Sequence, residues 1–348
     1  MWMPPEPLFP SSGMQWALFV LKPLYSGTEA VILFFLLSGL VLSFPYLGGK
    51  GQPYPKYLAR RVLRIYGPYL SALAMAVAGA SIWHGHPYHG IWAARMWSHP
   101  VNAAELAQHV AFLGVYEWHQ LDFVIWSLVH EMRISIFFPF LFLFAGWIGS
   151  RRALLLGVVL SGLGMIVIAN SADTSARYSF GMTLHYTTFF FAGIVFASNL
   201  EKLQRWWNRL ESAERRLIGI GAVAAYSLDQ QAAAMVLAFA GQQPWVVNGV
   251  SVASNWFAGA GAMGLMLIGL EAPPARRFLL AAPARFLGRI SYSLYLVHPV
   301  VLLALTFSLP ARISMGMQFP VYLCSALLVA WIFWMAVEEP FIRLSRAV

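Results

Sequence analysis

The feature that most constrains this 348-residue chain is a series of apolar stretches, each long enough to cross a lipid bilayer. A helix needs about 20 apolar residues to span a hydrocarbon core of about 30 Å. Only 11% of the residues are charged, against about 25% in soluble domains. The sequence therefore predicts an all-α fold, a polytopic transmembrane helix bundle with about nine spans. They are expected at 29–47, 66–83, 124–148, 153–170, 181–199, 217–240, 249–270, 289–309 and 319–337.

The polar intervals between these stretches alternate in charge. One set of intervals holds 18 of the 23 Lys and Arg residues, and the other set holds only Arg95, Arg177 and Arg312. Basic residues near the ends of spans remain on the cytoplasmic side. The pattern predicts a multi-pass protein of the cell (inner) membrane, with its C-terminus cytoplasmic and its N-terminus outside. The net charge of +9 is spread over five inner loops, so nucleic acid is not an expected partner.

The expected organisation is a short extracytoplasmic segment, 1–26, followed by one membrane domain, 27–343. The first residues lack the basic and apolar regions of a secretory signal peptide. A single cysteine, Cys324, excludes a disulfide framework.

Two arginines mark the inner end of the second span. Arg61 and Arg64 are three residues apart, so they share one helix face. Guanidinium groups in this arrangement bind phosphate bidentately. An ordinary positive-inside anchor is the alternative. In the span before it, Ser38 and Gly39 form a small-residue pair that lets helices approach closely in lipid.

The third span contains a cluster of ionisable residues. Counting from Asp122 at the outer surface places Glu131 about 13 Å deep. Such groups are costly at this depth unless they are paired or functional. His130 and Arg133 share a helix face, and Ser127 neighbours Glu131 at i and i+4. The structural alternative is a buried Glu–Arg pair that locks helices together.

The eighth span carries Ser291, Tyr295 and His298 along one helical stripe. Counting from Arg289 at the inner face places His298 about 13 Å deep as well. Glu131 and His298 are therefore expected at similar depth, where a carboxylate and an imidazole can perform acid–base chemistry. A histidine with a purely structural hydrogen bond is the alternative.

These segments, in this order, resemble the acyltransferase-3 family of membrane proteins, which includes O-antigen and other carbohydrate O-acetylases. The matching features are a Phe pair running into Ser-Gly, an Arg-x-x-Arg before an aromatic-Pro-Tyr turn, and a Trp-Ser-Leu-x-x-Glu. A Ser-Tyr-Ser-Leu-Tyr-Leu-x-His-Pro and a closing Glu339-Pro340 complete the set. The resemblance covers residues 27–343.

The resemblance implies transfer of an acyl group from cytoplasmic acyl-CoA, usually acetyl-CoA, to a hydroxyl of an extracytoplasmic carbohydrate or glycolipid. It implies that Glu131 and His298 are catalytic and that Arg61 and Arg64 bind the donor. No bound cofactor and no metal are expected. The expected supporting residues are Tyr292, Tyr295, Ser127, His130 and Arg133.

The family normally begins with a further transmembrane helix that carries an arginine and an essential histidine. Residues 1–26 contain no apolar segment of that length, so the chain is expected to lack this helix and to be inactive as written. Two other functions stay open. One is a proton-coupled transporter or flippase that uses Glu131 and His298 as a proton relay, and the other is a catalytically inactive, truncated family member.

The longest outer loop is expected at 84–122. The run from His84 to His89 suggests a metal site, but no carboxylate or cysteine accompanies it, so a polar loop over the mouth of the site is expected. The aromatic residues of the loop are expected in a belt at the headgroup level, with stacking on sugar rings as the alternative. They are Trp92, Trp97, Tyr116 and Trp118.

Overall fold

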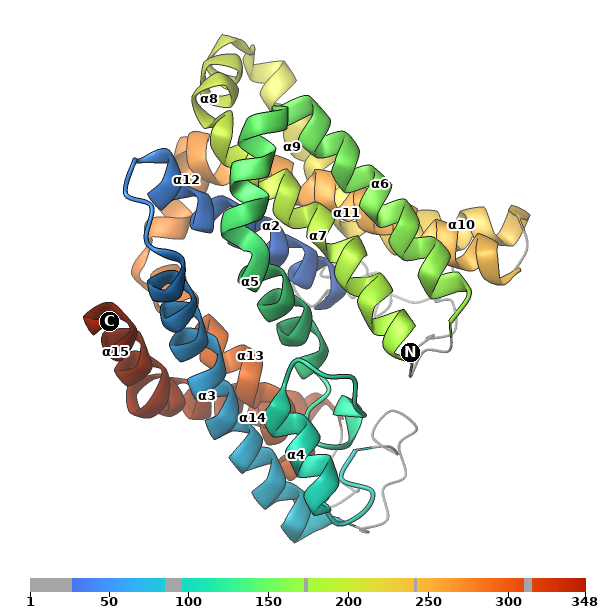
Figure 1. The fold of residues 1–348 in the computed structure, drawn as a ribbon, viewed down its shortest axis with the longest axis vertical. Helices are drawn as coiled ribbons and strands as arrows, with labels where there is room; N and C mark the ends of the chain where they lie inside the picture. The colour runs from blue at the N-terminus through green and yellow to red at the C-terminus, as the bar shows by residue number, and fades with distance from the viewer. Residues whose placement is uncertain (1–26, 85–95, 172–174, 241–242, 310–314) are drawn as a thin grey trace. The chain divides into compact units, whose positions relative to one another are not determined.

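The structure, a computed structural model, describes residues 27–84, 96–171, 175–240, 243–309 and 315–348. These residues are almost entirely helical and contain no strand (Figure 1). Within them, eight helical segments are long and apolar enough to cross a membrane. The all-α, polytopic fold is confirmed. The expected absence of a first helix concerns residues 1–26, which lie outside the described residues.

The chain divides into two compact units, one of Met1–Gly51 with Phe137–Leu279 and one of Gln52–Ile136 with Leu280–Val348. We call them unit 1 and unit 2. Neither the expected boundary at residue 27 nor that at residue 343 is tested by this division.

Unit 1 is built on close contact between helices α2 and α7. A Cβ atom on Gly39 would lie 2.4 Å from the carbonyl oxygen of Phe190, and one on Gly193 would lie 2.3 Å from that of Leu36. The small-residue pair at Ser38 and Gly39 thus serves helix packing. The helices of unit 1 are α2 (Gly27–Leu47), the second half of α5 (Ile125–Ile148), α6 (Ser150–Ala169), α7 (Ala176–Ser198), α8 (Leu200–Arg209), α9 (Ser212–Ser227), α10 (Asp229–Ala240), α11 (Pro244–Glu271) and most of α12 (Pro273–Leu280).

The expectation of a single span at 217–240 is wrong, because the chain forms α9 and α10 there with a break at Leu228. Polar residues 229–231 follow the break, and a continuous helix would have to carry them through the hydrocarbon. Helix α9 runs antiparallel to α11, since Gly261 faces Tyr226 and Gly264 faces Ala222. The two short helices both pack on α11.

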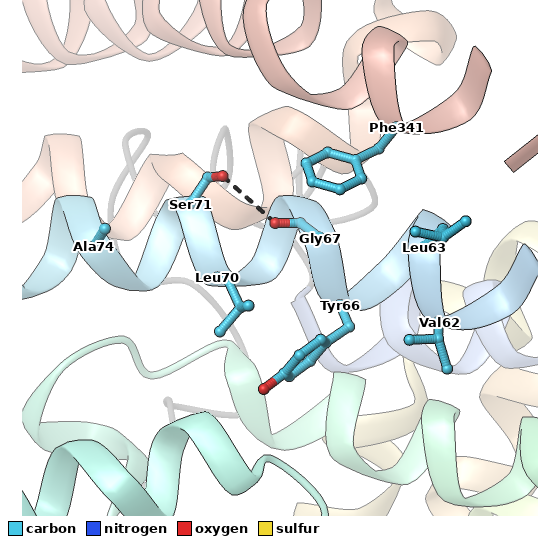
Figure 2. A pocket seen from close by; sticks show the side chains of 8 residues that line it. All are labelled: Val62, Leu63, Tyr66, Gly67, Leu70, Ser71, Ala74 and Phe341. Carbon is cyan, nitrogen blue, oxygen red and sulfur yellow. Dashed lines mark hydrogen bonds between the residues drawn. The ribbon is translucent and has the colours of Figure 1, made fainter. Parts of the chain in front are cut away.

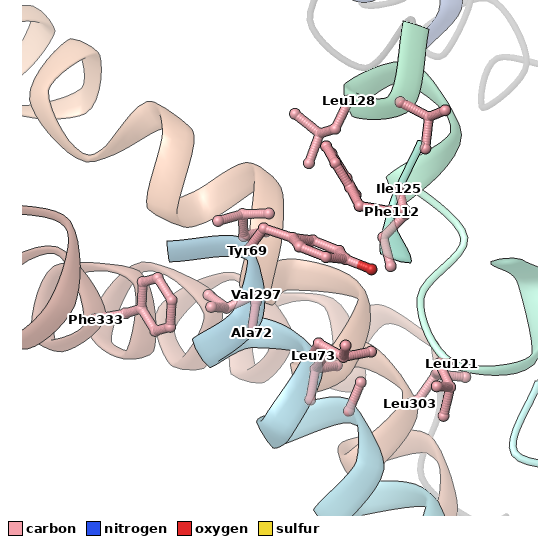
Figure 3. Packing of buried hydrophobic residues seen from close by; sticks show 14 of the residues in the cluster. Tyr69, Ala72, Leu73, Phe112, Leu121, Ile125, Leu128, Val297, Leu303 and Phe333 are labelled. Atoms are coloured by element: carbon pink, nitrogen blue, oxygen red, sulfur yellow. The ribbon is translucent and has the colours of Figure 1, made fainter. Parts of the chain in front are cut away.

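Unit 2 holds the hydrophobic core shown in Figure 3, where Tyr69 of α3 packs against side chains from α5 and α13. Helix α3 begins at Tyr54, twelve residues before the expected span, so Arg61 and Arg64 lie on this helix. The elements of unit 2 are α3 (Tyr54–Trp83), α4 (Ala103–Ala111), η2 (Trp118–Gln120), the first half of α5, α13 (Ala282–Ser308), α14 (Met315–Phe333), a π-helical turn η3 (Trp334–Glu338) and α15 (Glu339–Ala347).

The expectation that four aromatic residues of the loop form a belt at the headgroup level is wrong for two of them. Trp97 and Tyr116 are buried in the core of unit 2. The ring of Trp97 stacks on Trp83 and Phe307, with centroids 5.8 and 5.9 Å apart. Trp92 and all of the His84–His89 run except His84 lie outside the described residues. The loop therefore contributes aromatic side chains to the core, where neither lipid headgroups nor sugars reach Trp97.

Candidate active site

The carboxyl group of Glu131 meets Arg61 inside unit 2. An Arg61 nitrogen, Nη2, lies 2.5 Å from Glu131 Oε1, and both side chains are largely buried. The guanidinium also donates to Ser135 Oγ from Nη2, at 2.9 Å, and from Nε. The expected Glu–Arg pair therefore exists, but its arginine comes from the Arg-x-x-Arg motif on α3.

A proline of α5 accounts for one of the hydrogen bonds near this pair. A proline inside a helix has no N–H for the carbonyl four residues earlier. Pro139 thus leaves the Ser135 carbonyl without its helical donor, and the Tyr57 hydroxyl donates to it at 2.9 Å. The bond joins α3 to α5 one helical turn from Glu131.

Two tyrosines of α13 join this helix to its neighbours, Tyr295 to α5 and Tyr292 to α3. The hydroxyl groups of Tyr295 and Ser127 are 2.5 Å apart, and Tyr295 donates to the Val124 carbonyl at 2.8 Å. One turn earlier, Tyr292 donates to the Ile65 carbonyl of α3 at 2.9 Å. Four of the expected site residues, Glu131, Ser127, Tyr292 and Tyr295, thus lie in one neighbourhood.

The His298-Pro299 pair determines which ring nitrogen of His298 carries a proton. Pro299 has no N–H for the Tyr295 carbonyl. His298 Nδ1 lies 2.9 Å from this oxygen and 3.0 Å from the Leu294 carbonyl, and a carbonyl can only accept. Nδ1 is therefore the donor. Nε2 has no hydrogen-bond partner among the described residues, so it is free to accept a proton.

His298 lies beside the start of α5, whereas Glu131 lies further along that helix, and their similar depth in the membrane stays a prediction. The His298 ring neighbours Phe123, at 6.3 Å between centroids, and Phe123 precedes Glu131 by eight residues. Glu131 lies six residues after Ile125, the first residue of α5, which corresponds to about 9 Å of helix. The hydroxyl pair of Ser127 and Tyr295 lies between the two levels. The expected site is thus a line of polar groups along α5 and α13 instead of a single cluster.

A polar cavity of about 510 Å³ opens beside Tyr292. Three exposed arginines, Arg64, Arg289 and Arg346, line it together with Trp334, over which the Arg289 guanidinium lies 5.4 Å from the ring centroid. Arg64 and Arg61, expected to act together, are therefore separated. Arg64 faces this cavity, while Arg61 is bound to Glu131.

The sequence interpretation missed Glu338, which lines this cavity, and Ser293, which bonds to Glu338. Glu338 is buried, and its Oε2 accepts hydrogen bonds from the N–H and the hydroxyl of Ser293 at 3.1 and 2.5 Å. An ionisable residue at the end of an apolar span was the signal for Glu338. For Ser293 there was no such signal, because helical periodicity alone does not say whether Ser291 or Ser293 faces a neighbouring helix.

A second cavity, of about 400 Å³, is lined almost entirely by apolar side chains of α3 (Figure 2). Phe341 packs directly on Gly67, where a Cβ atom would lie 2.4 Å from the ring. Tyr66 extends from the same helix, and its hydroxyl donates to the Val110 carbonyl. This groove offers few polar groups for chemistry.

Arg133 holds the segment that follows α4. Its guanidinium donates to the carbonyls of Leu113 and Gly114 at 2.8 and 2.7 Å, just after α4. Tyr69 donates to the His109 carbonyl at 2.9 Å. These contacts fix the end of α4 against α3 and α5.

His130 is buried, with its ring 6.1 Å from that of Trp126. The supporting roles of His130 and Arg133 in catalysis stay predictions.

Asp122, before α5, is a buried carboxyl group whose titration should affect stability. Burial raises its pKa from 3.8 to about 7, and the hydrogen bond from the Val124 N–H opposes this shift. The folded state therefore holds more protons than the unfolded state between these values, and stability should fall as pH rises through this window. We expect Asp122→Asn to raise the free energy of unfolding at pH 8 by on the order of a few kcal/mol.

Thermal unfolding in detergent at pH 5 and pH 8 checks this expectation. The variant should melt at nearly the same temperature at both values, whereas the original chain should melt lower at pH 8. Glu117→Gln, which changes a half-exposed carboxyl group of the same loop, is the control. The same pH dependence in both Asp122→Asn and the original chain would contradict the assignment.

Taken together, the apolar helices and the buried ionisable groups define a multi-pass membrane protein with a polar site inside unit 2. The family model described as "Acyltransferase domain", Acyl_transf_3, matches residues 2–335. The chain belongs to the acyltransferase-3 family and is a membrane acyltransferase by that membership. Comparison with curated proteins gave no match, and comparison with solved structures gave none.

Proposed function

We propose that this protein transfers an acyl group, usually acetyl, from cytoplasmic acyl-CoA to a hydroxyl of an extracytoplasmic carbohydrate or glycolipid. The observation that carries the proposal is the line of polar groups in unit 2. It runs from the arginine-lined cavity past the Arg61–Glu131 pair and the Ser127–Tyr295 hydroxyls to His298. Such groups are costly within apolar spans unless they are paired or functional, and a line of several such groups favours function.

The cavity suits the phosphates of coenzyme A. Arg64, Arg289 and Arg346 come from three different helices and present their guanidinium groups around one space. Guanidinium groups bind phosphate through paired, charge-assisted hydrogen bonds. A volume of about 510 Å³ falls within the range of about 300–1,000 Å³ typical of ligand sites.

The other end of the line suits proton transfer from the acceptor. His298 Nε2 accepts the proton of the acceptor hydroxyl as the hydroxyl oxygen attacks the thioester carbon. The carbon–sulfur bond breaks, and the sulfur leaves as the thiol after taking up a proton. The bonded hydroxyl groups of Ser127 and Tyr295 lie between His298 and Glu131 in this line of polar groups.

The direction of transfer rests on the charge distribution. The excess of basic residues in alternate intervals supports a cytoplasmic C-terminus in the inner membrane. Arg64 and Arg346 belong to that basic set, so the cavity faces the cytoplasm in this proposal.

Reconstitution tests the proposal directly. The chain in proteoliposomes receives labelled acetyl-CoA on one side only, with a glycolipid acceptor in the bilayer. We expect label in the glycolipid only when the donor is on the side of the C-terminus. Movement of the acceptor across the bilayer without acylation would support a transporter instead. No label from either side would contradict the proposal and support the inactive, truncated family member.

The two motif arginines should differ in their kinetic effects. We expect Arg64→Ala to raise the KM for acyl-CoA about tenfold, because one charged hydrogen-bonding partner of the phosphates is lost. Arg61→Ala should instead lower kcat, because it removes the counter-ion of Glu131.

Steady-state kinetics with varied acyl-CoA separate the two outcomes. Arg343→Ala is the control, since this exposed arginine on α15 pairs with Glu339. A higher KM in Arg61→Ala with an unchanged kcat would show that Arg61 binds the donor after all.

A further inference from the structure

Glu338 is a buried carboxyl group in the arginine-lined cavity, at the end of the π-helical turn. The N–H of Glu339 bonds to the Trp334 carbonyl, five residues earlier. Pro340 explains the wider turn, because its ring would clash with the carbonyl four residues before it in a regular helix. Turns of this kind are rare and frequently occur at functional sites.

The two oxygens of this carboxyl group have different surroundings. Oε2 accepts both hydrogen bonds from Ser293, at 3.1 Å from the N–H and 2.5 Å from the hydroxyl. Oε1 has no hydrogen-bond partner among the described residues, and it is not fully buried. Since Glu338 lines the cavity, Oε1 is the oxygen that faces it.

The charged and titratable groups around the cavity are distributed unevenly. Arg64, Arg289 and Arg346 are exposed, whereas Glu338 is only 5% exposed. Glu339 pairs with Arg343 at 3.0 Å. Tyr292 also lines the cavity, but its hydroxyl proton is donated to the Ile65 carbonyl. Two carboxylates therefore line the cavity: Glu339, which is paired with Arg343, and Glu338, which is the buried one.

We propose that Glu338 is a specificity-determining residue that orients the donor. Its Oε1 accepts an N–H from an amide of the donor's pantetheine arm, and its negative charge keeps the phosphates at the arginines. Coenzyme A matches this polarity, since its nucleotide end is a polyanion and its arm carries uncharged amide N–H groups. This inference rests on the proposed function and adds the direction in which the donor enters.

Glu338→Gln is the informative variant. Its side-chain oxygen can still accept from Ser293, so the link to α13 is retained. The amide NH₂ then faces the cavity, where it cannot accept an N–H from the pantetheine arm. Glu339→Gln makes the same change of charge beside it without touching Ser293, and serves as the matched control.

The test measures binding of two fragments of the donor to the full chain in detergent. S-acetylpantetheine reports on the arm, and adenosine 3′,5′-bisphosphate reports on the phosphates. We expect Glu338→Gln to raise the Kd for S-acetylpantetheine about tenfold, because one charge-assisted hydrogen bond is lost. The Kd for adenosine 3′,5′-bisphosphate should not rise. Arg64→Ala should do the reverse. Glu339→Gln should not raise the Kd for S-acetylpantetheine.

The outcomes separate this inference from the proposed function. If Glu338→Gln weakens the binding of both fragments equally, Glu338 has a structural role, and if it weakens the binding of neither, Glu338 has no role. Either result overturns this inference and leaves the proposed function standing. Failure of the original chain to bind either fragment would overturn the donor assignment and this inference together. Ser293→Ala provides a second measurement, since releasing Oε2 should weaken S-acetylpantetheine selectively as well.

Discussion

Exchange of Glu131 for Gln should lower kcat for acyl transfer by about 10²–10⁴-fold, the range that a proton-transfer group contributes. Glutamine has nearly the same shape, so the packing of this 2%-exposed side chain is kept. The negative charge is lost, and Arg61 then keeps its charge at a buried position without a counter-ion. His298→Ala should cause a comparable loss, because it removes the imidazole whose Nε2 accepts the proton of the acceptor hydroxyl in the proposed reaction.

Measurement of kcat and KM for both variants, normalised to the amount of folded protein in the membrane, checks this prediction. The normalisation is needed because removing one partner of a buried ion pair can cost about 3–5 kcal/mol. His298→Ala leaves the ion pair intact and so separates chemistry from stability. Near-normal transfer by either variant would remove that residue from the site.

Gly193→Leu should prevent unit 1 from assembling, with a loss of about 3 kcal/mol or more in the free energy of unfolding. The first side-chain atom alone would lie 2.3 Å from the Leu36 carbonyl oxygen, 2.8 Å from the Leu40 nitrogen and 2.9 Å from the Gly39 Cα. All three are backbone atoms, so no rotamer change relieves the overlap. Helices α2 and α7 would have to separate.

Size-exclusion chromatography and thermal unfolding in detergent check this result. Gly162→Leu on α6 is the matched control, because a Cβ atom there meets nothing within 4 Å. The control should elute and melt like the original chain. A folded, normally melting Gly193→Leu protein would show that the close approach of α2 and α7 is not required.

Much of this protein could be predicted from local patterns in its sequence. The apolar stretches located eight of the nine expected spans, because each crossing needs its own run of apolar residues whatever its neighbours are. Motif order indicated the acyltransferase-3 family, and the family match confirms it. Glu131 and Arg61 also stood out as site candidates, because charged groups near or within an apolar span require a partner or a function.

The partner of each group was decided only by the tertiary structure. Helical periodicity gives the face of a residue on its own helix, but it does not give the register between helices, which side-chain packing determines. Glu131 therefore pairs with Arg61 of α3, seventy residues earlier in the chain. The offset of α13 along α5 places His298 beside Phe123. Glu338 enters the cavity wall through a π-helical turn, which no regular 3.6-residue pattern encodes.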